Sequence, residues 1–451
     1  MRINGDLNLK KFLGLILTGI FILSMFSLLT LKVNSQESSD WWYMSQKDLA
    51  NTGYYDSVGP MTNNVLWNST VGGWVWSDVA VVDGLVFVGC YDNKTYALDA
   101  TNGNIVWEYE TQDIVYSSPV VADGVLYIGS DDGNVYALDA KTGNLKWKFT
   151  TGDEVQAPAK VVNGIVYIGS ADNNFYALDA TNGDVIWMYT TGDDVIAPPA
   201  IAEGVVYIGS FDHNVYALDA TNGDKIWSFP TESFVESTPT FSDGVVYFGS
   251  FDNKTYAVDA TTGEKIWSVE TGHDLCVQSS PAVANGVVYI GSSYAGTLHG
   301  NVFAYNAADG SLKWEFKTDG LVFAAPIVVG DVVYVGSSYM GPAPNLNDPG
   351  SYTPEEIAEL MSVVLKGRRG HVYALDASSG EEIWNYQTGG AVYSSPAVVD
   401  GVMYIGSMDS NVYAFGPSDQ IELGDLITYL IIGIIIIVVV VLGLVMLRKK
   451  K

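Results

Sequence analysis

The chain has 451 residues, of which 48% are hydrophobic and 16% charged, so it can bury one large core or two smaller ones. Its net charge is −29 and its basic residues are few and scattered, which argues against nucleic-acid binding because such binding needs a basic surface to displace phosphate counterions. Two cysteines, Cys90 and Cys276, are too few for a disulfide framework.

The first 63 residues precede the repeating part of the chain. Residues 12–31 form an apolar run that follows Lys10 and Lys11. Residues 1–35 therefore predict either a signal peptide, cleaved before Gln36, or an uncleaved signal anchor. Residues 36–63 are expected to form a lead-in to the first repeat.

A repeat then dominates the sequence. The tripeptide Ala-Leu-Asp or a variant begins at Ala97, Ala137, Ala177, Ala217, Ala257, Ala304, Ala374 and Ala414. A tryptophan follows ten residues after the first seven, at Trp107, Trp147, Trp187, Trp227, Trp267, Trp314 and Trp384. The eighth unit lacks this tryptophan, and Trp67 instead precedes Trp107 by 40 residues.

Each repeat predicts four short antiparallel strands. Alternating Val, Ile and Tyr residues favour strands, Asp followed by Asn, Gly, His or Ser favours a hairpin turn, and a Gly precedes the fourth strand. Four strands in about 40 residues are typical of a β-propeller blade. We therefore predict an all-β, eight-bladed propeller over residues 64–416, closed by the strand around Trp67 and followed by a C-terminal transmembrane helix. The tryptophans are expected to be structural.

The repeat "ALDATNGDKIW" resembles the tryptophan-docking repeat of pyrroloquinoline-quinone (PQQ) type propellers, and "WWYMSQKDLANTGYYDSVGP" resembles the lead-in of their prokaryotic surface members. The resemblance covers residues 41–416. That family includes quinoprotein alcohol dehydrogenases and the propeller lipoprotein of the barrel assembly machinery. Membership in the dehydrogenase branch would imply PQQ with calcium, an adjacent cysteine pair and a catalytic aspartate. The two cysteines are not adjacent, so we assign no quinone site, no cofactor and no catalytic residue.

One column of residues varies where the surrounding repeat does not. It stands nine residues after each outer-strand tryptophan, or eleven in the sixth blade, where each innermost strand begins. The column is therefore expected to ring the mouth of the central channel, where it either binds a ligand or simply fills space. Its members are Trp76, Tyr116, Gln156, Ile196, Glu236, Gln278, Phe323 and Tyr393.

The seventh blade carries an insertion at about residues 339–369, between its second and third strands. Thr353 and Glu356 form a capping box that predicts a short amphipathic helix, docked on the ring or on a partner. Arg368 and Arg369 end the insertion, on the same face as the variable column. They are predicted to contact an anionic ligand or partner, the alternative being salt bridges with nearby carboxylates.

The sequence also contains histidines near the column's face and three sequons. The four histidines, His213, His273, His299 and His371, fall near the column's face, but they lack metal-ligand spacing, so no metal site is predicted. Asn68, Asn93 and Asn253 lie in Asn-x-Ser/Thr sequons and are candidate glycosylation sites.

The C-terminal end predicts a membrane tether. After a linker at 417–425, residues 426–447 are apolar enough to span a bilayer, and the basic tail at 448–451 favours the cytoplasmic side. The propeller would then lie outside the cytoplasmic membrane. We predict non-catalytic recognition or scaffolding of a protein or other cell-surface ligand through the loop-rich face, and no nucleic-acid binding. The alternative is a quinoprotein-like redox enzyme or a small-ligand module.

Overall fold

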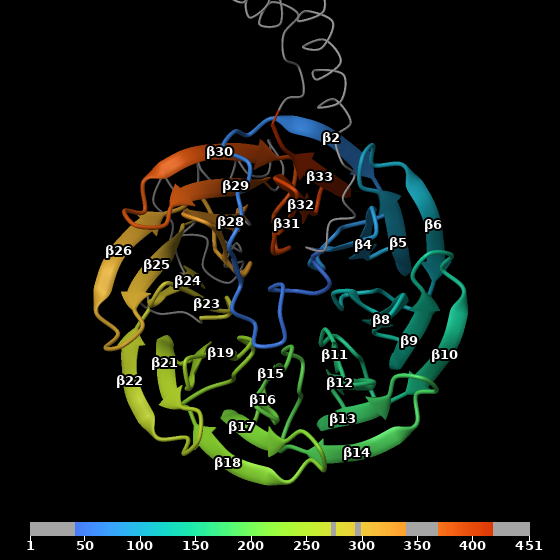
Figure 1. Ribbon diagram of the computed structural model, residues 1–451, viewed down its shortest axis with the longest axis vertical. Helices are drawn as coiled ribbons and strands as arrows, with labels where there is room; N and C mark the ends of the chain where they lie inside the picture. The colour runs from blue at the N-terminus through green and yellow to red at the C-terminus, as the bar shows by residue number, and fades with distance from the viewer. Residues whose placement is uncertain (1–40, 272–276, 294–298, 340–368, 418–451) are drawn as a thin grey trace, which may run out of the picture. The chain divides into compact units, whose positions relative to one another are not determined.

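The computed structural model describes residues 41–271, 277–293, 299–339 and 369–417. From Trp42 onward these residues belong to one unit, in which eight β-sheets are arranged around a central axis (Figure 1). Seven sheets have four strands and one has five. The predicted eight-bladed propeller is confirmed.

Each blade runs outward from a short inner strand to a long outer one. Blades one to four comprise β3(Ala80–Val82), β4(Leu85–Gly89), β5(Lys94–Asp99) and β6(Ile105–Glu110); β7(Val120–Ala122), β8(Val125–Gly129), β9(Asn134–Asp139) and β10(Leu145–Thr150); β11(Lys160–Val162), β12(Ile165–Gly169), β13(Asn174–Asp179) and β14(Val185–Thr190); β15(Ala200–Ala202), β16(Val205–Gly209), β17(Asn214–Asp219) and β18(Lys225–Pro230).

The second half of the ring repeats this order. Blades five to eight comprise β19(Thr240–Ser242), β20(Val245–Gly249), β21(Lys254–Asp259) and β22(Lys265–Glu270); β23(Ala282–Ala284), β24(Val287–Ser293), β25(Gly300–Asn306) and β26(Leu312–Lys317); β27(Ile327–Val329), β28(Val332–Tyr339), β29(Arg369–Asp376) and β30(Glu382–Thr388); β31(Ala397–Val399), β32(Val402–Gly406), β33(Asn411–Phe415) and β2(Val65–Thr70). The second and third strands are almost wholly buried, whereas the outer strands alternate exposed and buried residues.

The ring closes as the sequence predicts. Strand β2 pairs with β33 in antiparallel register, with Trp67 opposite Ala414, so that residues from the two ends of the propeller share the eighth blade (Figure 1). The closure covers a strand edge that would otherwise be unpaired.

The outer-strand tryptophans join neighbouring blades. The indole N–H of Trp147, for example, donates to the Ala180 carbonyl of the next blade at 2.9 Å. Gly183 has a φ of +78°, and an added Cβ there would lie 2.7 Å from the Trp147 ring, so this turn requires glycine. The tryptophans therefore serve as interblade packing groups.

The lead-in occupies the central channel, which the sequence did not predict. Residues 42–60, here called the plug, pass along the free edges of the inner strands (Figure 1). The backbone N–H groups of Val121, Ile201, Phe241, Val283 and Val328 donate to plug carbonyls at 2.6–2.9 Å. Because the inner strands have no further strand of their own at the axis, the plug satisfies donors that would otherwise face the channel.

The end of the plug also completes the ring. Strand β1(Tyr54–Tyr55) pairs in parallel with β27 and adds a fifth strand to the seventh blade. The Pro60 carbonyl then accepts hydrogen bonds from Trp384 at 2.9 Å and Tyr334 at 3.0 Å. In other blades a turn alanine accepts the corresponding bonds, so Pro60 replaces the turn that the eighth blade lacks.

Several sequence predictions fall outside the described residues. These are the signal segment, the interior of the blade-seven insertion with its capped helix, the linker beyond Gly416 and Pro417, and the span at 426–447. Within the described part of the chain, no helix has the length and hydrophobicity needed to cross a membrane. Of the insertion, only its ends are described: Tyr339 and Arg369 pair across β28 and β29.

Candidate functional site: the channel mouth

The structure places all eight residues of the variable column around one cavity. The cavity has a volume of about 120 Å³, and it lies on the channel axis. Seven of the eight side chains keep partial exposure, and only Tyr393 is buried, so the cavity is open at the column's end of the channel. Ser45 of the plug lines its other end. Whether the column binds a ligand stays a prediction, but its position at a one-ended cavity is established.

One half of the mouth is an aromatic arc. Phe323, Tyr393, Trp76 and Tyr116 come from the consecutive blades seven, eight, one and two. Tyr393 stacks on Trp76 with ring centroids 3.7 Å apart and on Phe323 at 5.0 Å. Tyr116 continues the arc, 5.4 Å from Trp76. These rings pack mainly on one another, so part of the column does fill the channel, as the simpler interpretation expected.

The other half of the mouth is a polar arc. Gln156, Ile196, Glu236 and Gln278 come from blades three to six and include one carboxylate. The Gln278 amide donates to Glu236. Burial raises the pKa of Glu236 to about 7, although this hydrogen bond opposes the rise. The negative charge of Glu236 also contributes to raising the pKa of Tyr116, after burial, so the two groups interact across the channel.

Further carboxylates surround the polar arc. The amide of Gln156 donates to Asp131 at 3.2 Å and to Glu154 at 2.8 Å. Burial raises the pKa of Asp131 to about 6, and the neighbouring Glu154 adds to the rise. Burial and the nearby Asp193 likewise raise the pKa of Asp194. The mouth therefore carries negative potential on the side of blades two to five.

The closed end of the cavity holds two charged residues that the sequence analysis missed. Asp78 lines the cavity, accepts a hydrogen bond from Ser45 of the plug and accepts another from the Ser395 N–H at 2.6 Å. Lys160 is 0% exposed, and its Nζ donates to the Ser45 carbonyl at 3.0 Å and the Asp48 carbonyl at 2.9 Å. Lys160 thereby attaches the plug to the third blade.

Burial shifts the ionisation of both groups. It raises the pKa of Asp78 and lowers the pKa of Lys160 to about 7, while the nearby Asp48 and Asp78 carboxylates oppose the change at Lys160. A signal for both was present in the sequence. Aligned by repeat, the positions of Asp78 and Lys160 hold only small, apolar or hydroxyl residues in the other blades.

The other predicted residues that the structure describes do not line the cavity. Arg369 is half-buried on β29, and Arg368 lies outside the described residues. Asn68 is exposed on β2, whereas Asn93 and Asn253 are half-buried in hairpin turns with φ of 68° and 70°. Their glycosylation stays a prediction. Among the described residues, no group of three His, Cys, Asp or Glu side chains is placed to hold a metal ion.

The comparisons with known proteins agree with this geometry. A family model described as outer membrane protein assembly factor BamB matches residues 53–195, 192–340 and 358–421, which together make up most of the chain. The chain belongs to this family. No curated protein matches the sequence.

Solved structures share the fold of this BamB-type propeller. BamB from Moraxella catarrhalis is 21% identical with a TM-score of 0.61, and the match covers 78% of this chain and 98% of that one. Quinohemoprotein alcohol dehydrogenase from Comamonas testosteroni is 16% identical with a TM-score of 0.67, covering 84% of this chain and 81% of that one. A europium-containing methanol dehydrogenase is 16% identical with a TM-score of 0.64, covering 82% and 90%.

The likeness to dehydrogenases raises the question of whether the cavity fits PQQ. Pockets for drug-sized molecules measure about 300–1,000 Å³, and the channel-mouth cavity, at about 120 Å³, is smaller. The Trp76 ring is already stacked on Tyr393. Glu236 and Asp78 would also repel the carboxylates of the quinone. Cys90 is buried, and burial raises the pKa of its thiol to about 12. The described residues do not fit this cofactor.

Proposed function

We propose that this BamB-type propeller is a non-catalytic recognition module that binds a protein partner through the face carrying the channel mouth. The observation that carries the proposal is the column itself. Eight positions that vary within an otherwise repeated sequence surround one cavity, and the plug closes the opposite end of that cavity. Variation at the open end of a repeated scaffold is typical of a binding face.

Family membership supports a protein partner. The matching model is described as an assembly factor for outer membrane proteins, and such a factor acts on other proteins. We further propose that the propeller lies outside the cytoplasmic membrane and is tethered by residues 426–447. The alternative function, quinone-dependent oxidation, is favoured by the fold of the dehydrogenase neighbours, but the cavity's size and charge oppose it.

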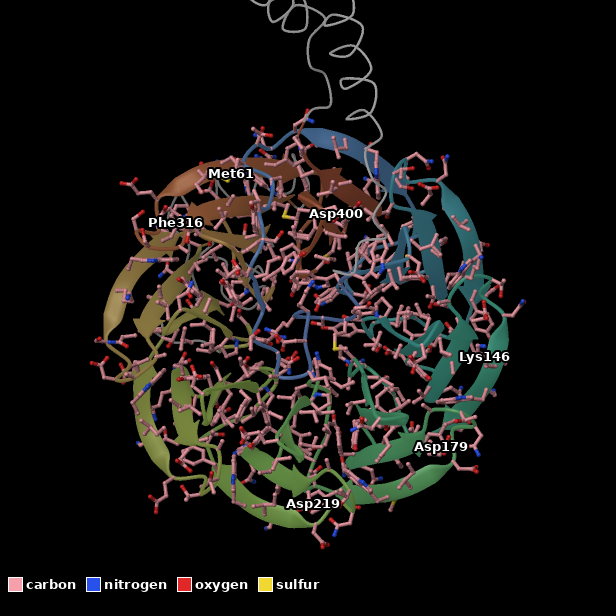
Figure 2. All side chains as sticks on the ribbon, in the orientation of Figure 1. Met61, Lys146, Asp179, Asp219, Phe316 and Asp400 are labelled. Carbon is pink, nitrogen blue, oxygen red and sulfur yellow. The ribbon has the colours of Figure 1, made fainter. Side chains whose placement is uncertain are left out.

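Photocrosslinking from the mouth tests the proposal. A photoreactive benzoylphenylalanine replaces Ile196, where other blades already carry Trp, Tyr or Phe. The matched control carries the same group at Thr181, an exposed turn residue whose N–H donates to Asp179 at 2.7 Å. Asp179 lies at the outer rim of the ring, away from the channel (Figure 2).

The expected result, in cells that make the full chain, is a discrete protein adduct from position 196 that is absent from position 181. Equal adducts at both positions, or no adduct at position 196 in a folded protein, would contradict recognition through the mouth. The adduct is a specific signal because the crosslinker reacts only with groups that lie within a few ångströms of it.

A further inference from the structure

We infer that the channel-mouth cavity binds a compact organic ammonium group, held between Glu236 and the end rings of the aromatic arc. The inference rests on the proposed function, because it names the chemistry that the same face would recognise. Two sources present such a group: a lysine side chain of a protein partner and a free alkylammonium ion.

The Glu236 carboxylate supplies the negative charge of the proposed site. Glu236 is enclosed in the channel, accepts one hydrogen bond from Gln278 and, among the described residues, has no ion pair with Lys, Arg or His. The residues that line the cavity include Glu236 and Asp78 but no basic side chain. An enclosed carboxylate without a cation is costly, and an entering cation would relieve that cost.

The end rings of the aromatic arc supply the second group that attracts a cation. Trp76 and Tyr393 lie within the stack, between other rings, whereas Phe323 and Tyr116 end it and meet the polar arc. Ring faces attract cations, most strongly where water is excluded. Glu236, Tyr116 and Phe323 line the same small cavity, so a cation beside Glu236 would also lie close to these end rings.

The charge and size of the cavity disfavour other ligands. Anions would be repelled by Glu236 and Asp78, and by Asp131 and Glu154 at the rim. A hard metal ion such as Ca²⁺ takes about six to eight oxygen ligands, and no metal-binding cluster exists among the described residues. The small volume admits a compact head group. An organic ammonium group fits the negative charge, the small volume and the aromatic lining of the cavity.

Calorimetric titration of the full chain in detergent micelles tests the inference. Three probes are compared: tetramethylammonium, n-butylammonium as a mimic of the lysine side chain, and 3,3-dimethylbutanol as a neutral probe with the same branched shape. Saturable binding of an ammonium probe, with the alcohol at least tenfold weaker, is expected. Equal binding of the alcohol, or no saturable binding by folded wild-type protein, would overturn the inference.

Matched variants locate the site. Glu236→Gln keeps the shape of the side chain and should weaken ammonium binding at least tenfold. Asp224→Asn removes an equal charge from an exposed turn that precedes β18, away from the cavity lining, and should leave binding unchanged. Phe323→Leu, which removes an end ring, should weaken binding severalfold. Unchanged binding in Glu236→Gln would overturn the inference, and thermal melting confirms that each variant is folded.

A competition experiment separates the two sources and the two proposals. If n-butylammonium suppresses the adduct formed from position 196, the natural group is a lysine side chain. If ammonium binds without suppressing the adduct, the natural ligand is a free ion. An adduct without any ammonium binding would support protein recognition and overturn only the ammonium site. The absence of an adduct would contradict only the proposal of protein recognition.

Discussion

The two ends of the central channel are built from the same eight inner strands, yet they differ in what meets those strands. At the closed end, backbone carbonyls of the plug accept hydrogen bonds from strand N–H groups, as Leu49 does from Ile201 and Thr52 from Val283. At the open end, side chains of the variable column face one another across a cavity. The closed end uses the main chain, which every blade offers alike, and the open end uses side chains, which differ from blade to blade.

This difference separates stability from recognition. A backbone contact tolerates sequence change, so the closed end depends on a few particular side chains. These are Lys160 and Asp78 of the blades, and Gln46 and Asn51 of the plug, whose amides donate to proline carbonyls of the blades. The open end leaves Glu236 partly accessible and without a cationic partner among the described residues, an arrangement that favours binding over stability. Changes at the two ends should consequently have different readouts.

The largest expected effect comes from breaking the closed end. Lys160→Met should lower the free energy of unfolding by about 3 kcal/mol, because two plug carbonyls lose a buried donor and Asp78 loses a nearby cation. Urea unfolding of the full chain at pH 7 measures the change. Lys148→Met, on the exposed face of β10, is the control and should change stability by less than about 0.5 kcal/mol.

The pH dependence adds a second signature of Lys160. Its pKa in the folded protein, about 7, lies below the ordinary value of 10.5, so the unfolded chain binds more protons between these values. This group therefore contributes stability that rises as pH increases from 7 to about 10, and Lys160→Met should abolish that contribution. A variant whose stability and pH profile both match the wild type would show that Lys160 does not hold the plug.

A smaller effect is expected at the open end, in ligand binding. The pKa of Glu236, about 7, means that the carboxyl is mostly neutral at pH 5.5 and mostly ionised at pH 8.5. Ammonium affinity should rise about thirtyfold over this range, since the cation binds the ionised form and pH 5.5 lies about 1.5 units below the pKa. Titration calorimetry at fixed ionic strength measures the rise.

Other titratable groups near Glu236 also contribute to the pH dependence of ammonium affinity, and the Glu236→Gln variant measures their share. Asp131 titrates near 6, Glu154 has a raised pKa at the same rim, and Asp78 and Tyr116 face the cavity, so Glu236→Gln should flatten the profile without removing every trace of it. An affinity independent of pH in the wild type would argue that Glu236 does not contact the cation.

The fold could be predicted because the same pattern of strands and turns recurs in each of the eight repeats. The spacing of the tryptophans predicts the number of blades. The position of Trp67 predicts that an N-terminal strand completes the last blade, and the pairing of β2 with β33 confirms this closure. The plug could not be predicted, because its residues follow no period and are held mainly through backbone groups. Gln46 and Lys47 adopt positive φ there, a conformation that their residue types do not favour.

The position of the site could be predicted from the sequence, but its two arcs and the raised pKa of Glu236 could not. Alignment of the repeats located the column, and the structure shows its members around one cavity. The division into an aromatic and a polar arc depends on the order of blades around a closed ring, which places blade one opposite blade five. The raised pKa of Glu236 depends on burial inside the assembled ring. Arg368 and the capped helix of the insertion stay predictions.

The smallest expected effect is that of the quinone itself. Adding PQQ with Ca²⁺ to the full chain should give no saturable absorbance change and no alcohol-dependent dye reduction. The reasons are those of the open end: the cavity is small and acidic, and the indole of Trp76 already stacks on Tyr393. Glu236→Gln should not create binding, because the loss of one charge leaves both the volume and the stack unchanged. Saturable quinone binding by the wild type would show that the aromatic arc opens to admit a planar ligand, and it would make the open end a cofactor site in place of an ammonium site.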